Sequence, residues 1–212
     1  MTEINQTERS RGVLLVNLGT PDAPERKPVA RFLREFLSDP RVVDLPRWLW
    51  LPLLNLVIIP FRAGRSAEAY REIWWPEGSP LLVLTERLAA GLAAPVPETT
   101  QVMNGKRYGD PSIRKGHDEL REASGGELVI VPLYPQFSHT TTSSIYDAVD
   151  EALEAMAWKP EQRRIEDYHV DEDWTCAIAA SIWEYRDVHG AAEKLMFSLH
   201  GIPERYERQG DP

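Results

Sequence analysis

A histidine near the end of the sequence lies in a setting that suits proton or metal chemistry. His200 follows the apolar run 195–197 and is flanked by Ser198 and Gly201. A strand that ends on such residues places polar side chains at the carboxyl edge of a sheet, where open α/β sheets bind ligands. With an unperturbed pKa of roughly 6.5, histidine accepts a proton near neutral pH, and its neutral ring is a ligand for transition metals. An isolated histidine is more often structural, so the case for His200 depends on what surrounds it.

Three other apolar runs of the sequence also end in polar loops. Residues 12–18 are typical of a buried parallel strand, residues 100–104 of a weak strand, and residues 127–133 form the clearest strand. The loops after these runs and after the run before His200 contain residues 19–21, Arg107 and Tyr108, residues 136–142, and residues 198–200. We therefore expect this polar chemistry to lie together at one edge of a sheet.

Helical periodicity fills the segments between these strands. Apolar residues recur at helical spacing in residues 28–37, 63–75, 80–92, 111–120, 141–156 and 173–190. Strands that alternate with helices predict an α/β protein whose Rossmann-like parallel sheet is flanked by helices. Lys159 and Pro160 interrupt the pattern and predict a domain boundary. Residues 1–160 then form the first domain, and residues 161–212 begin a similar second domain with strands at 164–167 and 194–199.

Composition excludes several classes of protein. The 212 residues are 42% hydrophobic and 27% charged, as in a globular chain, and the net charge of −9 argues against nucleic acid, because phosphate binding needs a basic face. A single cysteine, Cys176, excludes an internal disulfide and a four-cysteine zinc or iron–sulfur site within this chain. Residues 1–11 lack the apolar core of a secretory signal, so we expect a cytoplasmic protein.

The most apolar stretch, residues 45–61, falls short of the ~20 residues that a membrane-spanning helix needs. Three residues interrupt it: Pro52, Asn55 and Pro60. Two interpretations carry equal weight, a pair of helices buried against the domain and an apolar lip over an apolar ligand. Trp48 and Trp50 also suit contact with a membrane surface, because amphipathic aromatic side chains favour the interface.

Two common α/β functions lack their motifs in this sequence. No GxGxxG or Walker loop is present, and Pro21 removes a backbone donor where a phosphate cradle needs one. Ser198 lies near His200, but no G-x-S-x-G turn precedes a helix there. Nucleotide binding and serine hydrolysis are therefore not expected.

Five separated motifs together resemble the ferrochelatase family. They are LLVNLGTP, AYREIWWPEGSPL, KRYGDPS, PLYPQFSHTT and FSLHGIPERYERQGDP, in the family's order and spread over almost the whole chain. Their form is most similar to that of proteobacterial members. The resemblance implies two similar Rossmann-like halves with a cleft between them, and an apolar lip at residues 45–61.

The resemblance also implies an activity, the insertion of Fe²⁺ into protoporphyrin IX to form protohaem, which is the last step of haem biosynthesis. Fe²⁺ enters as a substrate metal, and no permanently bound cofactor is implied. His200 matches the family's active-site histidine, as proton acceptor, iron ligand or both. Four residues match positions on the porphyrin side: Leu18, Tyr70, Arg107 and Tyr108. The residues alone leave alternatives open, with Arg107 as a surface arginine paired with Asp110, and Leu18 and Tyr70 as core.

Members of the family continue well beyond the point where this sequence ends, and their remaining part carries a glutamate that faces the histidine. The sequence is therefore expected to be a truncated chelatase. The alternatives are an inactive fragment that at most binds porphyrin, and a chelatase for another metal or tetrapyrrole. Any membrane contact through residues 45–61 is expected to be peripheral, at the inner face. His139 is expected to be a loop residue rather than a second metal ligand.

Overall fold

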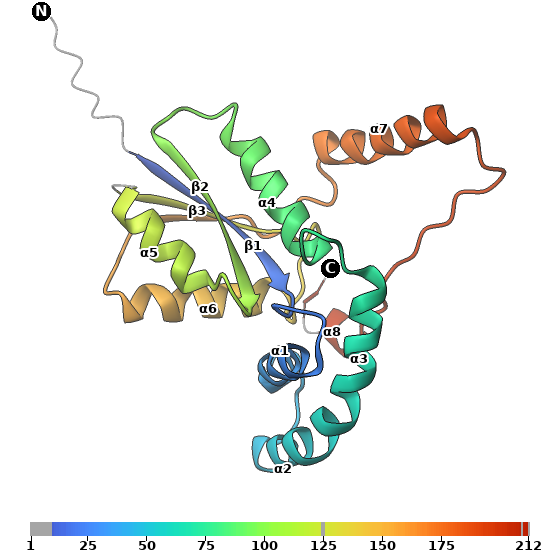
Figure 1. The fold of residues 1–212 in the computed structure, drawn as a ribbon. Coiled ribbons are helices and arrows are strands. Elements are labelled where there is room, and N and C mark those ends of the chain that lie inside the picture. Colours follow the sequence, from blue (N-terminus) through green and yellow to red (C-terminus); the bar gives the residue numbers. More distant parts are fainter. Residues whose placement is uncertain (1–9, 124–125, 209, 212) are drawn as a thin grey trace, which may run out of the picture.

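The computed structural model describes residues 10–123, 126–208 and 210–211 (Figure 1). In this part of the chain, parallel strands form a four-stranded sheet with the order β2-β1-β3-β4 and with helices around it. This confirms the predicted α/β class with a parallel, helix-flanked sheet. The expectation about a secretory signal concerns residues 1–11, most of which lie outside the described residues.

The sheet is centred on β1. In chain order the strands are β1 (Arg11–Gly19), β2 (Thr100–Tyr108), β3 (Glu127–Pro132) and β4 (Glu161–Arg164). β1 pairs with β2 on one side and with β3 on the other, and β4 pairs with the outer side of β3. The register places Gly19 opposite Tyr108 and Val16 opposite Pro132, so the carboxyl ends of β1, β2 and β3 meet at one edge.

The helices predicted from periodicity are present, with small shifts at their ends. The helices are α1 (Arg26–Ser38), α2 (Arg47–Leu53), the π-helix η1 (Leu54–Ile58), α3 (Ile59–Ile73), α4 (Pro80–Ala93), α5 (Ile113–Ala123), α6 (Thr142–Ala155), α7 (Glu172–His189) and α8 (Glu204–Glu207). α5 and α6 cover one face of the sheet, and α4 contacts β1 and β2.

The larger apolar core lies between the sheet and helices α5 and α6. Alternate residues of a strand point to one face, and the core-facing residues Leu14, Val16, Leu128 and Ile130 are completely buried. α6 meets them with side chains that share one helical face: Ile145, Val149, Ala152 and Leu153. Burial of each such large side chain stabilises the fold by about 1.5–3 kcal/mol, which fixes α6 against β1 and β3.

A second layer, made of α1, α2, η1 and α3, lies beyond the carboxyl ends of β1 and β2 (Figure 1). Its own apolar core is formed by α1, η1 and α3, and the ring of Tyr108 at the end of β2 joins it. Pro60 is the second residue of α3, but η1 runs into α3 without a break, so this proline lies inside a continuous helical path and interrupts its backbone hydrogen bonds beside the π-helix. This second layer therefore stands directly over the edge where the polar loops were expected.

The end of the described chain departs from the prediction. α7 begins at its N-cap Asp171, whose carboxylate accepts the Trp174 N–H at 3.0 Å, but none of its residues is buried, and it stands away from the sheet in Figure 1. The strand predicted at 194–199 is wrong, since residues 191–203 have no regular structure and are exposed. A strand is stabilised by backbone hydrogen bonds to a neighbouring strand, and none of the described segments pairs with this one.

The strand expected at 164–167 is found slightly earlier, as β4, and it does not belong to a second sheet. β4 pairs in parallel with β3, with Glu127 opposite Glu161 and Ile130 opposite Arg164. The segment 161–164 therefore extends the first sheet, because the edge of β3 offers it a hydrogen-bonding partner close in sequence. The domain boundary near residue 160 stays a prediction.

Helix α5 contains a histidine whose burial has a consequence for stability. His117 is completely buried, its ring packs edge-on against Trp158 with centroids 6.0 Å apart, and neither ring nitrogen has a hydrogen-bond partner among the described residues. Burial lowers the pKa of His117 to about 4. The folded state therefore resists protonation that the unfolded chain accepts at its ordinary pKa of 6.5.

His117→Leu should flatten the loss of stability in mild acid. Because the folded pKa is lowered, the wild-type histidine costs stability as the pH falls from 6.5 towards 4, by about 2 kcal/mol between pH 7 and pH 5. Leucine has similar volume and no proton to gain. Urea unfolding at both pH values should show the wild type losing more free energy of unfolding than the variant, and parallel losses would contradict the prediction.

Candidate active site

Three of the four groups of polar residues lie at one edge of the sheet, as expected, although Arg107 and Tyr108 are the last two residues of β2 and not part of the loop that follows it. Gly19 and Tyr108 are register partners, and the Leu133 N–H donates to the Val16 carbonyl at 2.7 Å, so the loops after β1, β2 and β3 begin side by side. The fourth group, at residues 198–200, lies instead in the exposed segment after α7. The structure thus brings together the carboxyl ends of β1, β2 and β3, whereas the strand predicted before His200 is absent and residues 198–200 do not join this edge.

The close approach of β1 and β2 at this edge requires a glycine. Gly19 has a φ of +109°, and a Cβ atom there would lie 1.9 Å from the Tyr108 carbonyl oxygen. Only a residue without a side chain tolerates both constraints. Gly19 therefore lets the chain turn away from the sheet while the end of β2 stays in register.

Arg107 and Tyr108 meet a buried carboxylate that sequence reasoning missed. Asp39, directly after α1, accepts on Oδ2 from Arg107 Nη2 at 2.6 Å, from the Tyr108 hydroxyl at 2.7 Å and from Ser144 Oγ at 2.6 Å. Its Oδ1 accepts the Arg41 N–H at 2.8 Å. In the sequence, Asp39 before Pro40 indicates only the end of a helix, and no local signal identifies partners as far away as Ser144.

The electrostatics of this cluster favour an ionised Asp39. Burial by itself would raise the pKa of Asp39, but the hydrogen bonds from Ser144 and Tyr108, with the nearby Arg107 charge, lower it below its usual value. Burial raises the pKa of Tyr108, which is therefore a neutral donor near pH 7. Arg107 thus pairs with Asp39 rather than with Asp110, and it also stacks over the Tyr108 ring with its guanidinium 4.6 Å from the ring centroid.

Arg107 keeps part of its guanidinium free. Its Nε donates to Ser144 Oγ at 2.8 Å and its Nη2 to Asp39, whereas Nη1 has no hydrogen-bond partner among the residues that the structure describes. The side chain is 20% exposed, but Tyr108 is only 1% exposed. Of the two residues, Arg107 is the one that can meet a ligand directly.

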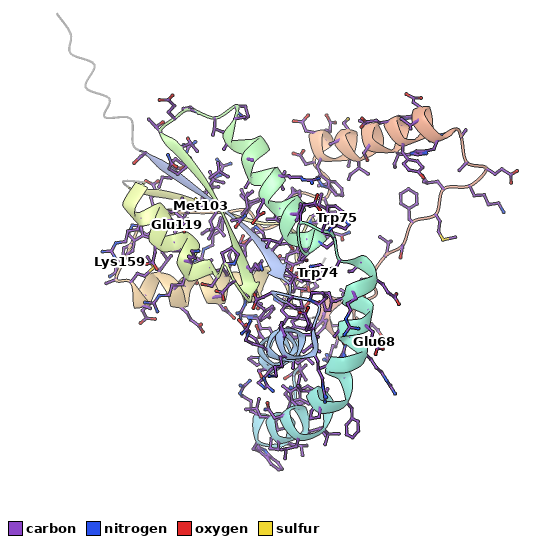
Figure 2. The ribbon with its side chains drawn as sticks, viewed as in Figure 1. Glu68, Trp74, Trp75, Met103, Glu119 and Lys159 are labelled. Atoms are coloured by element: carbon purple, nitrogen blue, oxygen red, sulfur yellow. The ribbon has the colours of Figure 1, made fainter. Side chains whose placement is uncertain are left out.

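Leu18 and Tyr70 are both partly buried and pack against the core of the second layer. The Tyr70 ring meets Phe32 and Trp74 edge-on, with centroids 6.5 and 6.2 Å apart. Figure 2 shows Trp74 and Trp75 at the turn between α3 and α4, close to the carboxyl edge of the sheet. Leu18 therefore lies at the end of β1 beside the polar edge, Tyr70 lies on α3 in the second layer, and both are half in the core.

Ser79 shows that a helix-start serine need not act as a cap. It is the N-cap residue of α4, but its side chain makes no capping hydrogen bond. Its hydroxyl instead accepts from Thr20 Oγ1 at 2.8 Å, and both residues are buried. This bond ties the loop after β1 to the start of α4.

The apolar stretch 45–61 forms a bent, continuous helical path through α2, η1 and the start of α3. It is neither wholly buried nor wholly exposed. Leu54 and Ile59 are core residues, whereas seven of its large apolar residues are exposed: Leu45, Trp48, Leu49, Leu53, Leu56, Val57 and Phe61. Trp48 is 80% exposed, but Trp50 packs on the core and donates its indole N–H to the Leu37 carbonyl at 2.6 Å. None of the described helices is both long and apolar enough to cross a bilayer.

His200 lies between α7 and α8 and is exposed. It makes no hydrogen bond to any residue that the structure describes. Within the described ranges, no group of three or more histidine, cysteine, aspartate or glutamate residues is placed to hold a metal ion. His200 is thus accessible, and it belongs to no group of three or more such residues in the described part of the chain.

Removal of the buried charge should destabilise the protein strongly. Asp39→Asn leaves the partly buried Arg107 without its counter-charge, and it takes one acceptor oxygen away from the groups that donate to Asp39. We therefore expect the free energy of unfolding to fall by about 3 kcal/mol. Asp147→Asn is the matched control, because Asp147 pairs with Arg41 at the surface and should cost less than about 1 kcal/mol. Urea denaturation followed by circular dichroism measures both, and equal small losses would contradict the assigned role of Asp39.

Comparison with known proteins agrees with the motifs. A model of the family described as ferrochelatase matches residues 10–212. The chain is 50% identical over 206 residues to the ferrochelatase of Xanthomonas axonopodis, 46% over 205 residues to that of Thioalkalivibrio sulfidiphilus and 47% over 209 residues to that of Methylococcus capsulatus. These matches cover 97%, 95% and 99% of this chain, but only 64%, 56% and 64% of the relatives. The chain therefore belongs to the ferrochelatase family.

Proposed function

We propose that this protein inserts Fe²⁺ into protoporphyrin IX, with His200 as proton acceptor, iron ligand or both. Membership of the ferrochelatase family supports the proposal, since the matched residues 10–212 include every motif discussed above. The observation that carries it furthest is the arrangement of those motifs, because three of them converge on one edge of the sheet beneath an apolar layer.

The reaction defines what the site must supply. Two pyrrole N–H groups lose their protons, and Fe²⁺ takes the place of the protons among the four nitrogens, so a base and an open path for the metal are needed. The exposed imidazole of His200 meets both needs, because imidazole is a proton acceptor and its neutral form binds ferrous iron. Apolar contacts with the macrocycle would support the distortion that exposes the pyrrole nitrogens.

The remaining predicted residues receive roles that fit their environments. Arg107 offers Nη1 to a propionate carboxylate, a planar pairing that suits arginine. Tyr108 acts through Arg107, because its ring is buried and its hydroxyl is bonded to Asp39. Leu18 and Tyr70 form part of the apolar wall near the porphyrin, and the exposed side of residues 45–61 forms the lip.

A second candidate is a protein that binds porphyrin without inserting iron. The observation that favours it is that, within the described residues, no group of three or more histidine, cysteine, aspartate or glutamate residues is placed to hold a metal ion. The chain spans about three fifths of the length of the relatives it matches. The two candidates differ in one measurable step, the appearance of haem.

The first test is a fluorescence titration of the 212-residue chain with protoporphyrin IX, followed by Fe²⁺ without oxygen. Saturable quenching and conversion to haem support the proposal, whereas quenching without conversion favours the second candidate. A well-folded chain that binds no porphyrin contradicts both.

His200→Ala tests the role of the histidine. Loss of a general base lowers metal insertion by roughly 10²–10⁴-fold, while porphyrin affinity should stay unchanged, because His200 is not needed to hold the macrocycle. His189→Ala, at the exposed end of α7, is the matched control and should insert iron normally. Near-normal turnover of His200→Ala would remove His200 from the mechanism.

Substitutions at Trp48 and Trp50 distinguish a binding surface on residues 45–61 from an ordinary part of the core. Trp48→Ser should weaken porphyrin uptake or binding to lipid vesicles with little change in stability, because Trp48 is exposed. Trp50→Ser should lower the free energy of unfolding by about 3 kcal/mol or more through lost packing. If Trp48→Ser changed only thermal stability, the exposed side of 45–61 would not be a binding surface.

A further inference from the structure

Among the residues that the structure describes, the segment that carries His200 is attached to the packed part of the protein at its downstream end and not at its upstream end. Upstream of it, α7 has no buried residue and residues 191–203 are exposed. Downstream, the chain packs again, because Tyr206 in α8 is 8% exposed and Asp211 is 3% exposed. Whatever fixes the position of His200 must therefore act through α8 and Asp211.

Asp211 binds the loop that follows β3. Its Oδ2 accepts the Ser138 hydroxyl at 2.6 Å, and its Oδ1 accepts the His139 N–H at 2.9 Å. The Asp211 side chain is fully buried, and its own N–H donates to the Tyr206 carbonyl at 3.0 Å. Since burial of a carboxylate is costly unless it is hydrogen-bonded, this contact fits one geometry and resists displacement.

We propose that Asp211 is a positioning residue that anchors the His200 segment to the loop 136–141 at the carboxyl edge of the sheet. The Ser138 hydroxyl and the His139 N–H form the receptor for its carboxylate. The anchor itself is independent of the proposed reaction, and its kinetic consequence rests on the proposed function.

Chain length shows why this anchor matters. His200 precedes the first residue of α8, Glu204, by a stretch of chain that reaches at most about 14 Å when extended. From His189, at the end of α7, the same histidine can be up to about 40 Å away. Docking of α8 through Asp211 therefore confines His200 to the neighbourhood of the edge that bears Arg107.

Hydrogen exchange tests the anchor without any substrate. In Asp211→Ala the His139 N–H loses its acceptor, so amide protection in peptides covering 136–143 and 203–211 should fall about tenfold or more. Asp211→Asn should keep most of the protection, because its amide oxygen accepts from His139 and its NH₂ group donates to Ser138 Oγ. Glu204→Gln, an exposed carboxylate on the same helix, is the matched control and should change neither peptide.

The position of His200 is measured by spin labels. Labels introduced by His200→Cys and by Glu119→Cys, on the outer side of α5 (Figure 2), in a Cys176→Ser background should give a defined distance distribution. Asp211→Ala should widen this distribution by about twofold or more, because the shorter tether is lost. In chains that make haem, Asp211→Ala should also lower kcat roughly 10- to 100-fold without changing porphyrin affinity.

Two results would overturn the proposal. Unchanged protection and an unchanged distance distribution in Asp211→Ala would show that Asp211 anchors nothing. A widened distribution with normal kcat would show that the anchor does not position His200 for the reaction. If Asp211→Ala does not fold, Ser138→Ala removes one of the two bonds and is judged by the same criteria. If the parent chain makes no haem, the proposed function fails. Amide hydrogen exchange and the spin-label distance distribution still show whether Asp211 anchors the segment.

Discussion

The buried carboxylate of Asp39 holds together three elements that are remote in sequence. It receives side-chain hydrogen bonds from the end of β2, through Arg107 and Tyr108, and from the start of α6, through Ser144. It follows α1, so the same oxygen joins the sheet, the helix that covers it and the layer at its carboxyl edge. An ionised group in such a place is tolerated only when its acceptors are filled. The geometry of the site therefore depends on this one charge.

This constraint also determines what Arg107 can do. An arginine on a flexible surface loses side-chain entropy when it binds a carboxylate, but Arg107 is already fixed by Asp39, Ser144 and the Tyr108 ring. A ligand that meets Nη1 therefore finds a donor in place. The cluster thus gives the buried Tyr108 a structural part, since its hydroxyl bonds Asp39 and its ring lies under the Arg107 guanidinium.

The two ends of the candidate site are held in different ways. On one side, the second layer presents exposed apolar side chains on a helical path that its own core keeps rigid. On the other side, His200 lies in an irregular segment that depends on α8 and Asp211. One wall of the candidate site is therefore held by an apolar core, and the other by the contacts of one short helix and one carboxylate.

The sequence by itself determined the class of fold, the main strands and helices, and the edge where the polar loops meet, because apolar periodicity and the turn residues are local signals. The family motifs identified His200, Arg107 and Tyr108 as candidates. Only the tertiary structure decided which side chains bind one another across the chain: Asp39 accepts from Arg107, Ser79 accepts from Thr20, and Asp211 accepts from Ser138. The strand expected at 194–199 failed for the same reason, since an apolar run becomes a strand only when a neighbouring strand receives its hydrogen bonds.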